Sequence, residues 1–379
     1  MSKVLITGGA GFIGTHLARV LLHSGHDVRI LDCLSTQIHG AVPTGLDWLE
    51  GKGIEFVRGS VTDRNRLREA IERIDVVVHL AAETGTGQSM YEIAHYTDVN
   101  VGGTALLLDV LANASQHTIK RVVLASSRAI YGEGAYICPF CNPLQRVYPN
   151  SRILSRLAAH QWEHQCNQCS GNLQPIATLE SDPANPASIY AATKFAQEDL
   201  LRIGCSALNI DYAILRLQNV YGEGQSLKNP YTGILSIFST LIRYGQHLPI
   251  FEDGQETRDF VHVQDVANAF LGAIEHQKPI GCAINVGTGV KTSVAEIAGY
   301  LSDAFGAKQN LVKTGEFRMG DIRHNFADVN VMYRELGRRS TIPISEGMRR
   351  FAQWVNTQRL PDDRLGQANA ELKSRGLMG

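Results

Sequence analysis

Short apolar runs alternate with amphipathic stretches along the chain as far as Leu217. The runs are partly β-branched, as in strands buried on both faces of a parallel sheet, and they lie at residues 4–6, 27–31, 76–80 and 122–125. Residues 12–22 follow the first run with the spacing of an amphipathic helix. Because strands and helices alternate, the pattern predicts a doubly wound α/β fold with a parallel sheet.

The pattern changes after residue 218. Helical spacing recurs at residues 234–244, 266–275 and 294–305. Strand-like runs lie at residues 249–263 and 282–286. Ser293 is placed to cap the last of these helices. We therefore expect a first domain of residues 1–218 and a smaller, discontinuous α/β domain built mainly from residues 219–357. The tail, residues 358–379, is polar and lacks periodicity, so we expect it to be poorly ordered.

The composition limits the number of domains, the class of ligand and the location that can be expected for the chain. With 379 residues, 44% of them hydrophobic, it can bury a large core and has room for about two domains. It carries 36 basic and 37 acidic residues, so its charge offers no basis for binding nucleic acid or a membrane surface. The first residues lack a signal-peptide pattern and no apolar run reaches transmembrane length, so we expect a cytoplasmic protein.

Three glycines, Gly8, Gly11 and Gly14, join the first apolar run to the first helix. Glycines in such a turn allow a tight bend, close approach of the backbone to a pyrophosphate, and close packing of helix on strand. The helix N-terminus adds amide donors and a positive dipole for an anion. The spacing G-x-x-G-x-x-G is related to the dinucleotide-binding fingerprint G-x-G-x-x-G but differs from it. A glycine-rich turn without a ligand is the alternative.

A carboxylate at the end of the second predicted strand favours a dinucleotide. Asp32 is placed to accept a hydrogen bond from a ribose hydroxyl, and its charge would repel a 2′-phosphate. No Lys or Arg lies within residues 32–36 to offset that repulsion. The sequence therefore predicts NAD rather than NADP as the cofactor.

Tyr190 and Lys194 stand four residues apart, and side chains with this spacing share one face of a helix. A phenol has an ordinary pKa of about 10, so it is a poor base at neutral pH unless a nearby cation favours its charged form. We therefore expect Lys194 to lower the pKa of Tyr190, so that Tyr190 can take a proton from a hydroxyl while the cofactor takes a hydride. Alone, this spacing is a weak signal, since ordinary exposed helices also contain it.

Taken together, these motifs resemble the extended short-chain dehydrogenase/reductase family over about residues 1–355. The resemblance implies an NAD-binding Rossmann domain in residues 1–218 and a substrate domain mainly in residues 219–357. In this family a serine or threonine stands four residues before a tyrosine that follows a strand of the sheet. Here the strand is the run at residues 122–125, the tyrosine is Tyr131 and the serine is Ser127, which would hydrogen-bond the reacting oxygen. The implied catalytic residues are Ser127, Tyr190 and Lys194. The implied cofactor contacts are Gly8, Gly11, Phe12, Ile13, Gly14, Asp32, Val61, Asp63, Leu80, Ala81, Ala82, Asn100, Tyr190 and Lys194.

Other segments resemble those that hold a nucleotide-diphosphate sugar in this family. They imply substrate contacts at Ser89, Asn219, Arg258 and Arg318. A guanidinium suits phosphate oxygens because its fork of donors matches them. Taken singly, each arginine is better explained by a surface ion pair, and the binding role is favoured because the motifs occur together in the family's order. The resemblance also implies a homodimer that pairs the helices near residues 100–115 and 188–204.

The reaction class is indicated by residues that are missing. Dehydratases of the family carry an Asp-Glu pair directly after the serine or threonine, where this chain has Arg128 and Ala129. Reductases of 4-keto sugars generally use NADPH, which Asp32 opposes. The resemblance therefore implies epimerisation at C4 through a transient ketone. A nucleotide-sugar dehydrogenase or 4-keto reductase is the alternative enzyme, and a catalytically silent NAD-binding protein is a third reading, which the intact catalytic residues disfavour.

The stretch between Ser127 and Tyr190 is longer than in most relatives, because it holds an insertion at residues 133–182. Two C-x-x-C pairs in it have nearly zinc-ribbon spacing: Cys138, Cys141, Cys166 and Cys169. We expect a structural Zn²⁺ that orders the insertion, with a metal-free thiol cluster and a disulfide pair as alternatives. Four thiolates leave no open position, so we expect no catalytic role for the metal.

The insertion also narrows the resemblance. Together with residues 35–40, 87–91 and 218–226, it is similar to the corresponding parts of dTDP-L-rhamnose 4-epimerases. This similarity implies conversion of dTDP-L-rhamnose to dTDP-6-deoxy-L-talose. The residue chemistry itself fixes neither the base nor the hexose.

Overall fold

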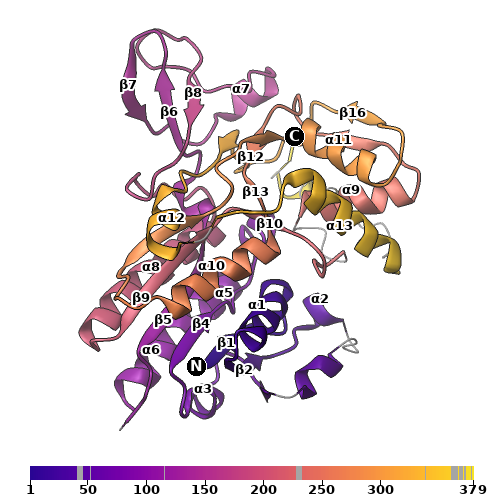
Figure 1. Ribbon diagram of the computed structural model, residues 1–379. Helices are drawn as coiled ribbons and strands as arrows, with labels where there is room; N and C mark the ends of the chain where they lie inside the picture. The colour runs from indigo at the N-terminus through magenta and orange to yellow at the C-terminus, as the bar shows by residue number, and fades with distance from the viewer. Residues whose placement is uncertain are drawn as a thin grey trace.

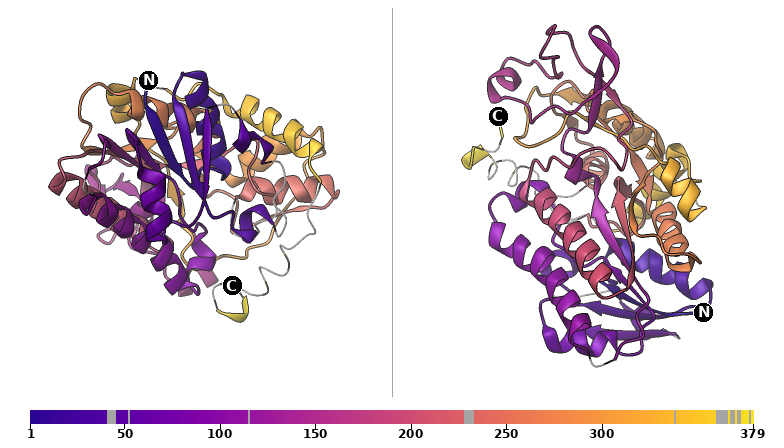
Figure 2. Two further views of the ribbon diagram at one scale, coloured as in Figure 1. Left: turned by 90° about the horizontal axis from the view of Figure 1, so that it is seen from below. Right: turned by 90° about the vertical axis from the view of Figure 1, so that its left-hand side faces the viewer.

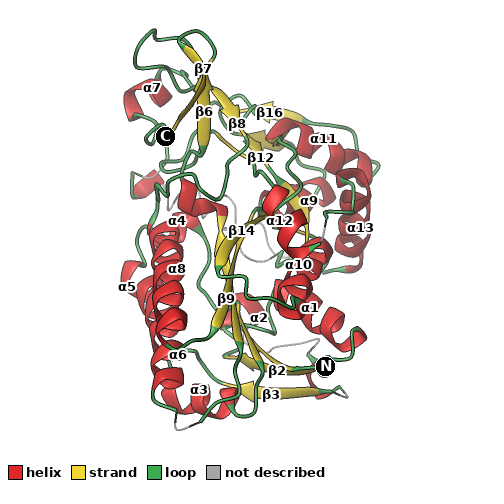
Figure 3. Ribbon diagram, turned by 60° about the vertical axis from the view of Figure 1, so that its left-hand side comes forward, coloured by secondary structure: helices red, strands yellow, loops and turns green. Residues whose placement is uncertain are grey.

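The computed structural model describes the chain in residues 1–40, 46–51, 53–114, 116–227, 233–337, 339–359, 366, 370, 373–376 and 378–379. Its centre is a parallel sheet of seven strands in the order β14-β9-β5-β4-β1-β2-β3, with helices on both faces (Figures 1 and 3). The strands are β1 (Lys3–Thr7), β2 (Asp27–Asp32), β3 (Ile54–Arg58), β4 (Val76–His79), β5 (Arg121–Ser127), β9 (Asp211–Leu217) and β14 (Cys282–Val286). The predicted doubly wound α/β fold is confirmed.

The side chains of β1 alternate between the two layers that cover the sheet. Val4 and Ile6 belong to the core on one face, and Leu5, between them, belongs to the core on the other. The helices of the first face are α1 (Phe12–His23), α10 (Val263–Glu275) and α12 (Asn330–Leu336). Those of the second face are α3 (Arg64–Ile71), α6 (Gly103–Ala112) and α8 (Ile189–Ala207). Burial on both faces explains why the strands read as continuous apolar runs.

The smaller part of the molecule has a core of its own, to which Phe238, Leu301 and Phe351 contribute. Its helices are α9 (Ile234–Arg243), α11 (Val294–Ala304) and α13 (Ile344–Thr357). Its short strands pair as β10 (Asn219–Tyr221) with β13 (Phe260–His262), β11 (Leu248–Ile250) with β16 (Leu311–Lys313), and β12 (Thr257–Arg258) with both β15 (Thr292–Ser293) and β17 (His324–Asn325). Ser293 caps α11 as predicted, in a capping box with Glu296.

One strand of the main sheet and two helices on its first face come from the half of the chain that the sequence assigns mainly to the second domain: β14, α10 and α12. β14 extends the main sheet beside β9, with Ile284 opposite Leu215, and α10 packs against α1. The chain therefore returns to the main sheet after it has begun the smaller part. A boundary at residue 218 marks the point where the chain first leaves the main sheet, but not the point where it returns to it.

The insertion at residues 133–182 forms a small module that projects at the end of the molecule far from the N-terminus (Figures 1 and 2). It is built on a three-stranded sheet with one helix: β6 (Ala135–Cys138), β7 (Asn142–Val147), β8 (Gln174–Ile176) and α7 (Leu154–Ala158). Its own core consists of Tyr136, Cys138 and Leu173 with two partly buried neighbours. A core of this size is too small to hold such a unit together by hydrophobic burial alone.

Short helical turns complete the described chain: α2 (Thr36–His39), η1 (Asp47–Glu50), α4 (Thr86–Ser89), α5 (Ile93–Tyr96), the π-helical η2 (Thr97–Gly102) and η3 (Arg128–Tyr131). Much of the tail predicted to be poorly ordered, residues 358–379, lies outside the described residues. In its described part, Met378 forms an antiparallel bridge with Arg318. Every helix in the described ranges is too short or too polar to cross a membrane.

Candidate active site

The glycine turn between β1 and α1 has the backbone geometry that the sequence predicts. Gly8 has a φ of +68°, and a Cβ there would lie 2.9 Å from the Ala81 Cα atom. A Cβ on Gly14 would lie 2.5 Å from the Gly9 Cα atom, so this position needs glycine for helix and turn to pack. The N-cap of α1 is Gly11, which has no side chain to bond the first amides of the helix. Those amides therefore remain able to bind an anion.

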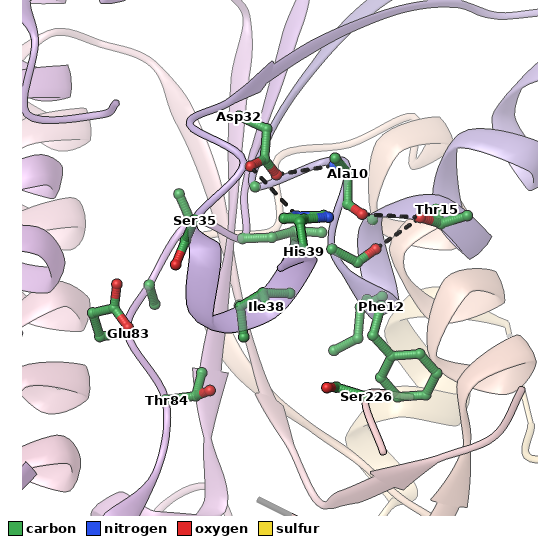
Figure 4. Close-up of a pocket in the computed structure, with 18 of the residues that line it drawn as sticks. Ala10, Phe12, Thr15, Asp32, Ser35, Ile38, His39, Glu83, Thr84 and Ser226 are labelled. Atoms are coloured by element: carbon green, nitrogen blue, oxygen red, sulfur yellow. Dashed lines mark hydrogen bonds and ion pairs between the residues drawn. The ribbon is translucent and has the colours of Figure 1, made fainter. Parts of the chain in front are cut away.

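Asp32 is buried at the end of β2 and faces the same turn (Figure 4). Its Oδ2 accepts a hydrogen bond from the Ala10 amide at 3.0 Å, and its Oδ1 accepts one from the Leu34 amide at 2.8 Å. A carboxylate has about four acceptor sites, so capacity remains for a ribose hydroxyl. His39 Nε2 lies 3.9 Å from Oδ1. This neighbour could not be predicted from the cations near Asp32 in the sequence, because no Lys or Arg lies within residues 32–36 and His39 stands seven residues away.

A cleft of about 1670 Å³ connects the glycine turn to the end of β5. Thirteen of the predicted cofactor and catalytic residues line it: Gly8, Gly11, Phe12, Ile13, Gly14, Asp32, Val61, Leu80, Ala81, Ala82, Ser127, Tyr190 and Lys194. Asp63 caps α3, accepting hydrogen bonds from the Asn65 and Arg66 amides at 2.9 and 3.2 Å. Asn100 is buried and bonds Glu83 and Thr193. Asn100 therefore joins the segment after β4 to α8.

Three side chains meet where β5 ends beside α8. The hydroxyl of Ser127 favours the charged form of the Tyr190 phenol, and Ser127 Oγ accepts a hydrogen bond from the Ala129 amide at 3.1 Å. The ammonium of Lys194 is buried and donates to the Ala125 carbonyl at 3.0 Å. Burial lowers the pKa of Lys194 to about 8, against the opposing charge of Glu198.

The pKa of Tyr190 departs from the sequence-based expectation. Burial raises it above its ordinary value, and the hydrogen bond with Ser127 and the charge of Arg128 act in the opposite direction. The expected lowering by Lys194 is not found, because the pKa of Tyr190 is shifted by desolvation, Ser127 and Arg128. Arg128, whose place in the sequence argued only against dehydration, is the cation that favours the phenolate.

The predicted substrate residues lie in two places. Ser89 accepts a hydrogen bond from the Tyr190 amide at 3.1 Å and donates to the Thr86 carbonyl at 2.7 Å, so it fixes the start of α8. Asn219 Oδ1 accepts a hydrogen bond from Arg128 Nε at 2.7 Å. These bonds hold the backbone at Tyr190 and the side chain of Asn219, the first residue of β10.

The two predicted arginines differ in their surroundings. The guanidinium of Arg258 donates to the carbonyls of Thr257, Ile322 and Arg323 at 2.9, 2.7 and 3.1 Å. The guanidinium of Arg318 lies 4.9 Å from the centre of the Phe251 ring. Arg258 is near enough to Arg128 for their charges to repel, which places it close to the end of β5.

The structure brings the four cysteines of the module together. Their sulfur atoms all lie within 4.8 Å of one another, with Cys138 to Cys169 at 3.7 Å and Cys166 to Cys141 at 3.8 Å. Four sulfurs about 2.3 Å from a tetrahedral Zn²⁺ would be about 3.8 Å apart, so the cluster fits this ion. All four thiols are free, which does not match the disulfide alternative.

Backbone amides support the same arrangement. The amide of Cys141 donates to the sulfur of Cys138, and that of Gly171 donates to the sulfur of Cys169, both at 3.4 Å. Such bonds stabilise thiolates, the form in which cysteine binds a metal. The donor set therefore suits a closed structural site.

Comparison with known proteins places this site in a family. The model of the NAD dependent epimerase/dehydratase family matches residues 4–177 and 168–287. The chain belongs to this family. Over 362 residues it is 36% identical to the dTDP-L-rhamnose 4-epimerase of Burkholderia thailandensis, and the match covers 93% of this chain and 94% of that protein. It is 31% identical to the UDP-glucose 4-epimerase of Mycolicibacterium smegmatis, with 94% and 99% covered.

Solved structures of family members have the same fold. The UDP-glucuronic acid 4-epimerase from Bacillus cereus in complex with UDP-glucuronic acid and NAD matches with a TM-score of 0.75 and 25% identity, covering 93% of this chain and 99% of that chain. The dTDP-glucose 4,6-dehydratase from Streptomyces venezuelae with NAD bound matches with a TM-score of 0.74 and 26% identity, covering 94% and 98%. Epimerases and dehydratases thus resemble this chain equally in fold, and the residues of the site must separate them.

Proposed function

We propose that the protein is an NAD-dependent 4-epimerase of a nucleotide-diphosphate sugar, with dTDP-L-rhamnose as substrate and dTDP-6-deoxy-L-talose as product. The observation that carries the proposal is the composition of the site at the end of β5. Ser127, Tyr190 and Lys194 meet there, while Arg128 and Ala129 stand where a dehydratase needs an acid and a base. The similarity to the Burkholderia enzyme supports the choice of sugar.

The geometry supports a division of roles among the chain's own residues. The glycine turn, Asp32 and Lys194 would hold NAD, which when bound supplies the acceptor and then the donor of the C4 hydride. Tyr190 takes the proton of the C4 hydroxyl and later returns a proton to the same oxygen. Ser127 acts on the Tyr190 phenol and favours its charged form, so we assign it the role of orienting the substrate oxygen. Lys194, fixed on the Ala125 carbonyl, keeps a positive charge beneath the reacting groups.

Three further properties belong to the proposal. One structural Zn²⁺ is held by the four cysteines, since their sulfurs are already spaced for it. The protein is a homodimer through the outer faces of α6 and α8, the helices of the two ranges that the family resemblance implies. It acts in the cytoplasm, where nucleotide sugars and reduced thiols are expected.

Asp32→Ala should weaken NAD binding by about 10-fold or more and narrow the preference for NAD over NADP, because it removes a charged acceptor and the repulsion of a 2′-phosphate. Titration of both cofactors against wild type and variant measures this. Asp32→Asn is the matched control, since it keeps an acceptor oxygen for the Ala10 or Leu34 amide but removes the charge. A wild-type protein that prefers NADP contradicts the assignment.

Deuterium at C4 of dTDP-L-rhamnose should be retained in the epimerised product, because the hydride that leaves C4 returns to the same carbon on the other face. Proton NMR and mass spectrometry of the product measure the label. UDP-glucose and dTDP-glucose serve as alternative substrates that test the choice of base and hexose. Loss of the label to solvent, or its appearance on released NADH, would favour the dehydrogenase alternative instead.

A further inference from the structure

Arg128 is the first residue after the catalytic serine, and its side chain is only partly satisfied by the protein. It opens η3 and is half-buried. Its Nε donates to Asn219 Oδ1 at 2.7 Å. A guanidinium has five N–H donors, and within the described residues no other hydrogen bond of Arg128 is formed. Most of its donors therefore have no partner within the described residues.

Several other buried or half-buried arginines in the described part of the chain are neutralised by carboxylates. The pairs are Arg121 with Asp211, Arg152 with Glu252, Arg216 with Glu198, and Arg323 with Glu163. Neither Arg128 nor Arg258 has a carboxylate within ion-pair distance among the described residues. A partly buried cation without a counter-ion costs folding free energy, so its retention at this place calls for an anion from outside the chain.

The charges around Arg128 also favour binding of an anion. Burial lowers the pKa of its guanidinium to about 9, and the charge of Arg258 lowers it further. Asp321, Tyr190 and Glu133 act in the opposite direction. Within the described residues Arg258 donates its hydrogen bonds to backbone carbonyls, and neither of the two guanidiniums has a carboxylate at ion-pair distance. A bound diphosphate would supply the negative charge that both lack, and the planar fork of arginine fits phosphate oxygens.

We propose that Arg128 binds the phosphate that carries the hexose, with Asn219 holding its guanidinium in place and Arg258 as the second cation at the diphosphate. The inference rests on the proposed function and names a further substrate-contacting residue for it. Arg128 neighbours both Ser127 and Asn219, so it lies between the reacting hydroxyl and the residues expected at the diphosphate.

This position suits an epimerase in particular. The sugar ring must present first one face and then the other to the hydride carrier. Tight binding of the ring in one orientation would therefore oppose the reaction. Binding of the phosphate next to the ring holds the substrate while the ring turns. Binding energy taken from this non-reacting group can then hold the sugar at the catalytic residues.

The test compares nucleoside diphosphates with monophosphates on the NAD-loaded enzyme, using calorimetry with dTDP and dTMP and, in parallel, UDP and UMP. Wild type should prefer the diphosphate. Arg128→Gln should reduce that preference by about 10-fold or more, with the affinity for the monophosphate unchanged, because only the second phosphate loses a charged partner. Arg128→Lys should restore part of the preference through its charge. Arg349→Gln, an exposed arginine on α13, is the control and should behave as wild type.

The outcomes separate this inference from the function on which it rests. If wild type converts a nucleotide sugar but folded Arg128→Gln keeps the full preference for the diphosphate, the inference is wrong and the function stands. Equal losses for diphosphate and monophosphate also overturn it, since they indicate a general structural role. If wild type binds none of the four nucleotides and converts no nucleotide sugar, the proposed function fails as well.

Discussion

Tyr190→Phe should lower kcat by at least about 10²-fold, the usual cost of losing general acid–base catalysis. The phenol is the group placed to carry the C4 proton, and phenylalanine keeps the ring and its packing on α8. NAD binding should survive, because the glycine turn and Asp32 are untouched. Stopped assays of epimerised sugar give kcat, and a cofactor titration tests binding.

A second variant and the pH dependence of kcat test the role of Tyr190 further. Ser127→Ala should cost less than Tyr190→Phe, since tyrosine can still take a proton from a poorly oriented alcohol. In wild type, kcat should rise with pH, because burial raises the pKa of Tyr190 and the phenol must lose its proton before it can act as a base. A Tyr190→Phe enzyme that keeps more than about a tenth of wild-type turnover contradicts the assignment.

Features set by neighbouring residues could be predicted from the sequence. The first helix, expected at residues 12–22, spans Phe12–His23, and the strand expected at residues 282–286 spans Cys282–Val286. The cap at Ser293 depends only on its own helix. The spacing of the cysteine pairs likewise indicated a cluster that the structure brings together. In each case the periodicity or the turn chemistry of a short segment carries the information.

Features that depend on distant segments could not be predicted in this way. β14 joins the main sheet because its backbone pairs with β9, which lies far earlier in the chain. The pKa of Tyr190 depends on how deeply α8 buries the phenol, and no local spacing reports burial. Arg128 was visible only as a departure from the dehydratase pattern. Its importance follows from Asn219 and Arg258, which meet it through tertiary contacts.

The cysteine module is connected to the predicted substrate arginine by a series of partly buried contacts. Glu163, which lies between the two cysteine pairs, accepts from Arg323 Nη2 at 2.6 Å and contacts His324 Nε2 at 3.1 Å. The carbonyl of Arg323 in turn accepts from Arg258 at 3.1 Å. A second link runs from Glu133, at the start of the module, to the Arg323 amide at 2.7 Å. Ordering the module therefore helps to fix the guanidinium of Arg258.

Loss of the metal should consequently affect both stability and substrate binding. Elemental analysis should find about one zinc per chain, coordinated by four sulfurs. Cys166→Ser should lower the free energy of unfolding by at least about 3 kcal/mol, as expected when a metal that replaces a missing core is lost. Cys282→Ser, a half-buried thiol outside the cluster, should cost less. Denaturant unfolding with and without a chelator measures the difference.

In the residual folded Cys166→Ser enzyme, KM for the nucleotide sugar should rise more than kcat falls, because Arg258 loses its support while Ser127, Tyr190 and Lys194 lie outside the module. NAD affinity should be unchanged, since the glycine turn is formed by β1 and α1. Glu163→Gln tests the connection without touching a cysteine and should shift KM in the same direction. A fully active protein with no metal and four free thiols would show that the module holds itself together by packing alone, and the zinc proposal would then fail.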